Sequence, residues 1–111
     1  MVIKLSDNAR FLLDKANEYR WDAMDFRNNG DETRAIAYRS TSICYDATLD
    51  LLIENEMNPN KTLQDLAVEL RRRETALLAL SESENKDEIM RFRWKISSTI
   101  FGVLARLFEG E

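Results

Sequence analysis

Glycine and proline are scarce in this chain, and their scarcity constrains the fold more than any other feature. The 111 residues include three glycines and one proline, namely Gly30, Gly102, Gly110 and Pro59. Strands joined by tight turns need such residues repeatedly, whereas long helices contain few of them. Alanine, leucine, arginine and glutamate, which favour helices, are common instead. The sequence therefore predicts an all-α fold with more than about three quarters of the residues in helices.

Polar caps and breakers divide the chain into four predicted helices, at about 7–28, 32–57, 62–80 and 86–108. Ser6 is the cap candidate for the first helix, and Asn29-Gly30-Asp31 combines a stop, a turn and a new cap. Asn58-Pro59 ends the second helix, and Thr62-x-x-Asp65 resembles a capping box. Asn85 is the cap candidate for the fourth. Because short links make neighbouring helices antiparallel, we expect one domain, a four-helix bundle built from two antiparallel helical hairpins.

Apolar residues recur every three or four positions in the first three helices, as one buried helix face requires. The predicted core stripes are Leu5, Ala9, Leu12, Ala16, Tyr19, Ala23 and Phe26, then Tyr38, Tyr45, Leu49 and Leu52, then Leu63, Leu66, Leu70, Leu77 and Leu80. Phe11 and Trp21 lie off the first stripe, where they can extend an exposed surface.

The fourth helix is apolar over a wider arc than the others, about 200° of its circumference. One stripe comprises Ile89, Phe92, Ile96, Ile100, Val103 and Leu107, and the other comprises Met90, Trp94, Phe101, Leu104 and Phe108. A helix packed on a single surface needs roughly half that width. We therefore expect one stripe to face the core and the second, from Met90 to Phe108, to contact another chain. A central helix covered entirely by its own three partners is the alternative.

The absence of some residue types excludes several classes of enzyme. The chain has no histidine, which removes Ser-His and Cys-His nucleophilic systems, ordinary zinc enzymes and histidine phosphotransfer. Cys44 is the only cysteine, so no intrachain disulfide forms, and a reducing, cytoplasmic compartment is expected. Cys44 is interpreted as a buried structural thiol. No apolar run reaches transmembrane length, and no cofactor is predicted.

The net charge of −4 is distributed unevenly. Residues 1–57 hold 7 basic and 11 acidic residues, whereas residues 58–111 hold 9 of each. This balance argues against a dedicated nucleic-acid binder. A basic strip on the third and fourth helices remains an alternative, with Arg71, Arg72, Arg91 and Lys95 as the candidate phosphate contacts.

Two acidic stripes form a further candidate site, Glu18, Asp22 and Asp25 on the first helix and Asp46, Asp50 and Glu54 on the second. Facing carboxylates on two helices resemble the magnesium site of all-helical nucleotide pyrophosphohydrolases, which implies a Mg-dependent nucleotide hydrolase as another alternative. The stripes, however, point away from the predicted core, and Asp22 and Asp50 lie roughly 18 Å apart along the hairpin. We therefore expect two solvated faces and no divalent-ion site.

Two charged residues fall in the middle of predicted apolar faces, Glu74 on the third helix and Arg93 on the fourth. If the link between these helices is centred near Ser83, positions 74 and 93 lie at the same level of the hairpin. The sequence therefore predicts an ion pair between the two helices, with both side chains reaching solvent at the rim as the alternative.

These patterns favour a non-enzymatic helical interaction module over an enzyme. The predicted partners are a second copy of the chain, as a dimer or higher oligomer, or another protein. The expected interface residues are Met90, Trp94, Phe101, Leu104 and Phe108. No membrane partner is expected.

Overall fold

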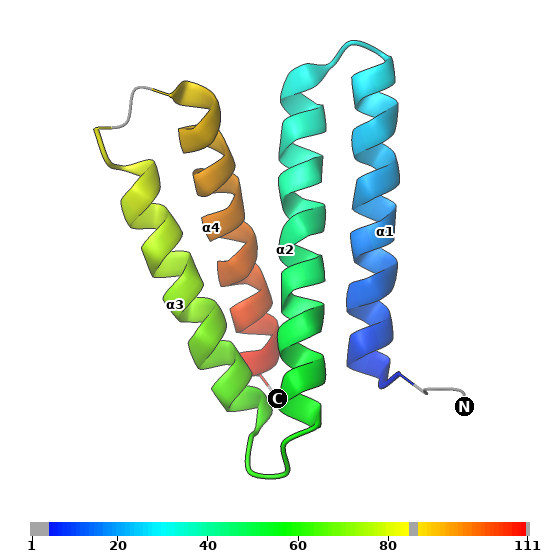
Figure 1. Ribbon diagram of the computed structural model, residues 1–111, viewed down its shortest axis with the longest axis vertical. Coiled ribbons are helices and arrows are strands. Elements are labelled where there is room, and N and C mark those ends of the chain that lie inside the picture. Colours follow the sequence, from blue (N-terminus) through cyan, green and yellow to red (C-terminus); the bar gives the residue numbers. More distant parts are fainter. Residues whose placement is uncertain (1–4, 85–86, 111) are drawn as a thin grey trace. The chain divides into compact units, whose positions relative to one another are not determined.

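The computed structural model describes residues 5–84 and 87–110, and these form four helices. They are α1 (Asp7–Asn28), α2 (Glu32–Glu56), α3 (Leu63–Ser81) and α4 (Glu88–Glu109). Their lengths of 22, 25, 19 and 22 residues confirm that more than three quarters of the chain is helical. The chain divides into two compact units, Met1–Glu54 and Asn55–Glu111. Each unit contains one antiparallel hairpin, α1 with α2 and α3 with α4, as predicted (Figure 1).

Most of the predicted helix ends are confirmed by their caps. The Ser6 side chain accepts a hydrogen bond from the Ala9 amide, and Thr62 and Asp65 form a reciprocal capping box. Gly30 has a φ of 81°, the left-handed conformation that lets the chain reverse between α1 and α2.

The fourth helix begins close to its predicted start, with a different cap residue. α4 begins at Glu88, and the carboxylate of Asp87 caps it by accepting hydrogen bonds from the amides of Ile89 (3.1 Å) and Met90 (3.2 Å). An aspartate directly before the helix satisfies amides that have no intrahelical partner. Asn85, the predicted cap, lies outside the described residues.

The first hairpin brings its helices close together along a row of alanines. Ala9, Ala16 and Ala23 repeat every seven residues on α1 and are 1%, 0% and 5% exposed. Small side chains at this spacing let α2 approach the α1 backbone directly. The Ser42 hydroxyl donates a hydrogen bond of 2.9 Å to the carbonyl oxygen of Ala16. This contact fixes the register of the two helices.

Aromatic rings form a second row beside the alanines of the first hairpin. Tyr45 lies between Phe11 and Tyr19, with ring centroids 6.4 and 5.4 Å away. Tyr38 continues the row between Tyr19 (5.9 Å) and Phe26 (4.9 Å). Such edge-on and tilted contacts add to the stabilisation from area burial. Burial, followed by the nearby Tyr19, raises the pKa of Tyr45 above its ordinary value.

In the second hairpin, Leu66 and Leu70 of α3 are buried as predicted, at 3% and 0% exposure. Leu80, also expected in the core, is 45% exposed. It lies roughly 80° around the helix from Leu70, outside the buried arc. The Ser98 hydroxyl donates a hydrogen bond of 2.9 Å to the carbonyl oxygen of Glu74, which places these residues at one level of the hairpin.

The predicted ion pair between Glu74 and Arg93 is wrong. The Glu74 carboxylate accepts a 2.9 Å hydrogen bond from Arg71 on its own helix, and Arg93 is exposed. The reason is the register, because Ser98 occupies the level expected for Arg93. Five residues along a helix amount to about 7.5 Å.

The Glu74 carboxylate instead lies against Gly102 of α4. A Cβ atom at Gly102 would collide with the Glu74 carboxylate oxygen Oε2. Glycine inside a helix is less favourable than alanine by about 1 kcal/mol. The close approach of Glu74 therefore explains why glycine is accommodated at this buried position.

We expect Gly102→Ala to stabilise the protein by about 1 kcal/mol only in a Glu74→Ala background. With Glu74 present, the new methyl group displaces the carboxylate from Arg71 and offsets the helix-propensity gain. Urea unfolding of the four proteins in a double-mutant cycle should show coupling of at least about 0.5 kcal/mol. Equal stabilisation in both backgrounds would contradict the contact.

Candidate interaction surface

An apolar stripe on α4 remains accessible in the folded chain. This outer stripe comprises Ile89, Phe92, Ile96, Ile100, Val103 and Leu107. Ile89, Val103 and Leu107 are 52%, 51% and 43% exposed, and the other members are half-buried. Steps of three and four residues keep the stripe on one side of the helix over a length of about 27 Å.

The other apolar stripe of α4 contains the predicted interface residues, and most of it is buried. Phe101, Leu104 and Phe108 are 5%, 1% and 0% exposed, while Met90 and Trp94 are half-buried. The three buried side chains therefore have almost no surface to lose on association. Both stripes were identified from the sequence, but the one that stays accessible is the outer stripe.

Small residues explain which side of α4 turns inward. Ser98, Gly102 and Ala105 follow one another at steps of four and three residues, on the same side as Phe101, and all three are buried. They allow α3 to approach, as the Ser98 hydrogen bond to Glu74 shows. This spacing of small residues is the sequence signal that indicates which apolar stripe of α4, the one containing Phe101, faces the core.

The rim of the outer stripe is basic. Arg93 lies on one side of the stripe, Arg106 on the other, and Lys95 farther out beside Arg106. All three are exposed, and none forms an ion pair with any residue in the described part of the chain. The sequence from Met90 to Arg106 contains no acidic residue. Arg93 and Lys95 therefore border the stripe without a carboxylate partner among the described residues, whereas Arg106 is close enough to Glu109 to help lower the pKa of that carboxyl.

Two of the four candidate phosphate contacts are already paired with carboxylates. Arg71 donates two hydrogen bonds to Glu109, of 2.9 and 2.7 Å, in addition to its bond with Glu74. These bonds raise the pKa of Arg71 and lower the pKa of Glu109. Arg72 lies 3.1 Å from a Glu69 carboxylate oxygen.

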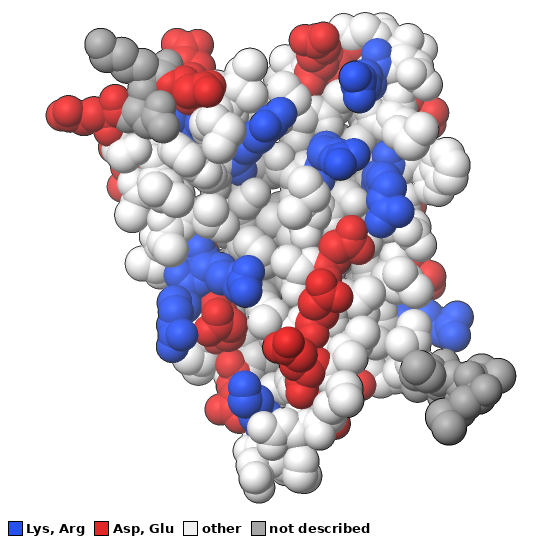
Figure 2. All heavy atoms as spheres, in the orientation of Figure 1, with Lys and Arg blue, Asp and Glu red and all other residues white. Residues whose placement is uncertain are grey.

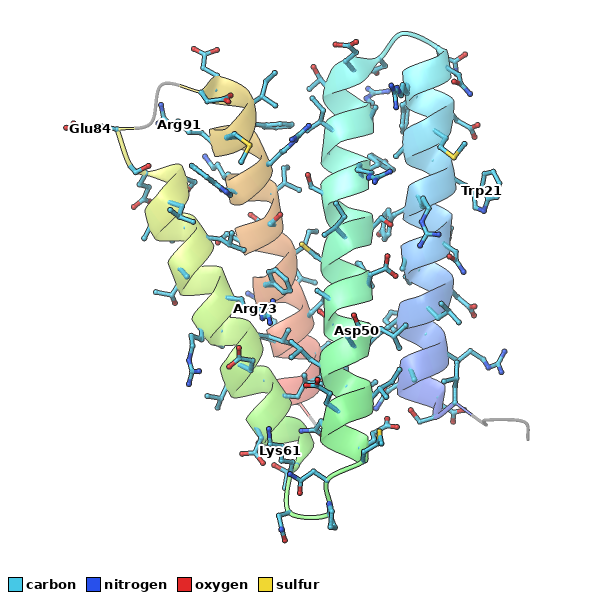
Figure 3. All side chains as sticks on the ribbon, viewed as in Figure 1. Trp21, Asp50, Lys61, Arg73, Glu84 and Arg91 are labelled. Carbon is cyan, nitrogen blue, oxygen red and sulfur yellow. The ribbon has the colours of Figure 1, made fainter. Side chains whose placement is uncertain are left out.

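The other two candidate phosphate contacts, Arg91 and Lys95, lie at the opposite end of the hairpin. Arg91 donates a 3.2 Å hydrogen bond to the carbonyl oxygen of Ser81, which is ten residues from Arg71 along α3 and thus about 15 Å away. The structure therefore does not gather the four cations into one strip. Figure 3 shows Arg91 near the end where α3 gives way to α4.

Arg91 and Lys95 line a hollow of about 430 Å³ between the ends of α3 and α4. Its walls are Leu78, Ser81, Glu82, Glu88, Arg91, Phe92 and Lys95. Glu82 and Glu88 balance the two cations, so the hollow offers no net positive charge for a polyanion.

The acidic stripes of the first hairpin lie on its surface. Arg20 reaches across from α1 to Asp46 of α2 at 3.2 Å, and Asp50 and Glu54 are exposed. Acidic side chains follow one another on the face in Figure 2 where Figure 3 places Asp50. Among residues 5–84 and 87–110, no three carboxylates or thiols come close enough together to hold a metal ion.

A smaller apolar patch lies on α1. Trp21 and Met24 are 65% and 47% exposed, and Figure 3 shows Trp21 pointing away from the helix. Phe11 is 40% exposed, so both off-stripe aromatics of the first helix are accessible as expected.

Cys44 of α2 is buried, at 1% exposure, consistent with a structural thiol.

No family model, curated protein or solved structure matches this chain. In the described part of the chain, none of the helices is long and apolar enough to cross a membrane.

Proposed function

We propose that this protein is a non-enzymatic helical interaction module that self-associates or docks a partner protein through the outer stripe of α4. The observation that supports it is the exposure of Ile89, Val103 and Leu107 on one continuous apolar stripe. Contiguous exposed apolar surface is costly in water, at about 25 cal/mol per Å², and commonly marks a protein-binding site. Trp21 and Met24 offer a second contact area on α1.

The two alternative functions have less support. A nucleic-acid-binding strip would use Arg71 and Arg72, whose guanidinium groups already pair with Glu109, Glu74 and Glu69. A Mg-dependent nucleotide hydrolase would need converging carboxylates, whereas Asp46 pairs with Arg20. Neither has an observation in its favour comparable with the outer stripe.

We expect Val103→Asp to weaken association through the outer stripe without unfolding the chain, because Val103 is 51% exposed. Two measurements test this. Light scattering across protein concentrations reports self-association. Fluorescence anisotropy reports binding of a labelled helical peptide with leucines at three- and four-residue spacing and glutamine at the flanking positions. The wild type should self-associate, bind the peptide, or do both. Val103→Asp should weaken that association about tenfold or more.

Val68→Asp provides a matched control, because Val68 is 62% exposed on α3 of the same hairpin and lies away from the outer stripe. It should leave association unchanged. A wild type that stays monomeric at high concentration and ignores the glutamine-flanked peptide would contradict the proposal. Equal loss in both variants would remove the outer stripe as the contact surface.

A further inference from the structure

We infer that the occupant of the outer stripe is an amphipathic helix of a partner protein whose flanking positions carry carboxylates. The inference rests on the proposed function and names the chemistry of the partner. It follows from the shape of the stripe and from the charges beside it.

The shape of the outer stripe fits a helix. Its members, Ile89, Phe92, Ile96, Ile100, Val103 and Leu107, follow steps of three, four, four, three and four residues. This is the spacing at which one helix packs its apolar side chains between those of another. The stripe is long and one helix face wide, and it matches an apolar face with anchors at i, i+3 or i+4, and i+7.

The charges beside the stripe favour an acidic partner. Arg93 and Arg106 border it on opposite sides, and Lys95 lies beyond Arg106. All three are exposed, and none lies within ion-pair distance of a carboxylate in the described residues, although Arg106 interacts at longer range with Glu109. Charges beside a helix–helix contact set the choice of partner. Carboxylates flanking the partner's apolar face would meet cations on both sides.

The same charges disfavour pairing of α4 with α4 of a second copy. Between Met90 and Arg106 the helix offers Arg91, Arg93, Lys95 and Arg106 and no acidic residue. Where the stretches from Met90 to Arg106 of two copies overlap, cations of one rim would face cations of the other, and like charges in this position are destabilising. A different protein helix therefore suits the outer stripe better than a second α4.

An anionic membrane surface would also meet a basic rim and an apolar stripe, but the rest of the chain opposes it. The net charge is −4, and from Asp46 to Glu56 the sequence contains four acidic and no basic residues. A surface of like charge repels the whole molecule. A single partner helix interacts only with the local rim.

The test compares three labelled helical peptides that share the leucine spacing of the neutral probe and carry glutamate, glutamine or lysine at the flanking positions. We expect the glutamate peptide to bind about tenfold more tightly than the lysine peptide at low salt, the sum of a few exposed ion pairs. This difference should shrink as salt screens the charges. The double variant Arg93→Glu/Arg106→Glu should reverse the preference, whereas Lys61→Glu, in the link before α3, should not change it.

Other outcomes overturn the inference in distinguishable ways. Equal binding of all three peptides, each weakened by Val103→Asp, would keep the docking function and remove the acidic partner. A wild-type dimer that Val103→Asp dissociates, with no peptide binding, would identify a second copy as the occupant. Capture by phosphatidylserine-containing vesicles, lost in Val103→Asp and without preference for the glutamate peptide, would assign the stripe to a membrane surface. No association of any kind would overturn the proposed function as well.

Discussion

Leu104→Ala is expected to lower the free energy of unfolding by about 2–5 kcal/mol, and Leu107→Ala by about 1 kcal/mol or less. The chemical change is the same and the positions are one helical turn apart. Leu104 is 1% exposed, so truncating it removes buried contacts and leaves a cavity. Leu107 is 43% exposed and belongs to the outer stripe, where the protein can relax and water can fill the space.

Urea unfolding at low protein concentration measures this difference without a contribution from association. The contrast decides which apolar stripe of α4 belongs to the core. Similar losses at both positions, or a larger loss at Leu107, would mean that the outer stripe is covered in the folded chain. This result would contradict both the proposed docking surface and the assignment of Leu104 to the core.

The class of fold could be predicted because local signals agreed along the whole chain. The Thr62 and Asp65 pair forms the predicted capping box, and Gly30 adopts the left-handed turn expected between α1 and α2. Such signals depend on a few neighbouring residues, so a single sequence contains them. The two antiparallel hairpins follow directly from the short links.

The register and the inward side of α4 depend on contacts between helices, and these were not predicted. Placing Glu74 opposite Arg93 required an exact link length, and the later start of α4 behind Asp87 brings Ser98 to that level instead. Likewise, Phe101 was predicted to contact another chain because it is a large aromatic residue. The nearby small residues Ser98 and Gly102, however, bring α3 to that side of the helix.

The candidate site was predicted in part for the same reason. Periodicity shows that α4 has two apolar stripes but carries no information about which one the folded chain covers. The sequence also does not show which cations pair with carboxylates, so it could not single out Arg93, Lys95 and Arg106 as the basic rim. Arg71, for example, forms an ion pair with Glu109, which is distant in sequence.

The seven-residue spacing of the alanines on α1 indicates an apolar face but does not show how closely α2 approaches it. Ala16 is 0% exposed, and its carbonyl oxygen accepts the 2.9 Å hydrogen bond from Ser42. A hydroxyl group is short, so this bond requires the α2 backbone to lie near α1. Any larger side chain at Ala16 must push the two helices apart.

Ala16→Leu is therefore expected to destabilise the first hairpin, lowering the free energy of unfolding by about 1–3 kcal/mol despite the added apolar surface. The Ser42 hydrogen bond should be lost with it, so Ser42→Ala, which costs about 1 kcal/mol alone, should cost less in the Ala16→Leu background. Chemical denaturation of the four proteins measures both effects. Ala76→Leu, the same change at an exposed position of α3, should alter stability by no more than about 0.5 kcal/mol. If Ala16→Leu were neutral or stabilising, the two helices would have room between them, and close packing along the alanines could not be what fixes their register.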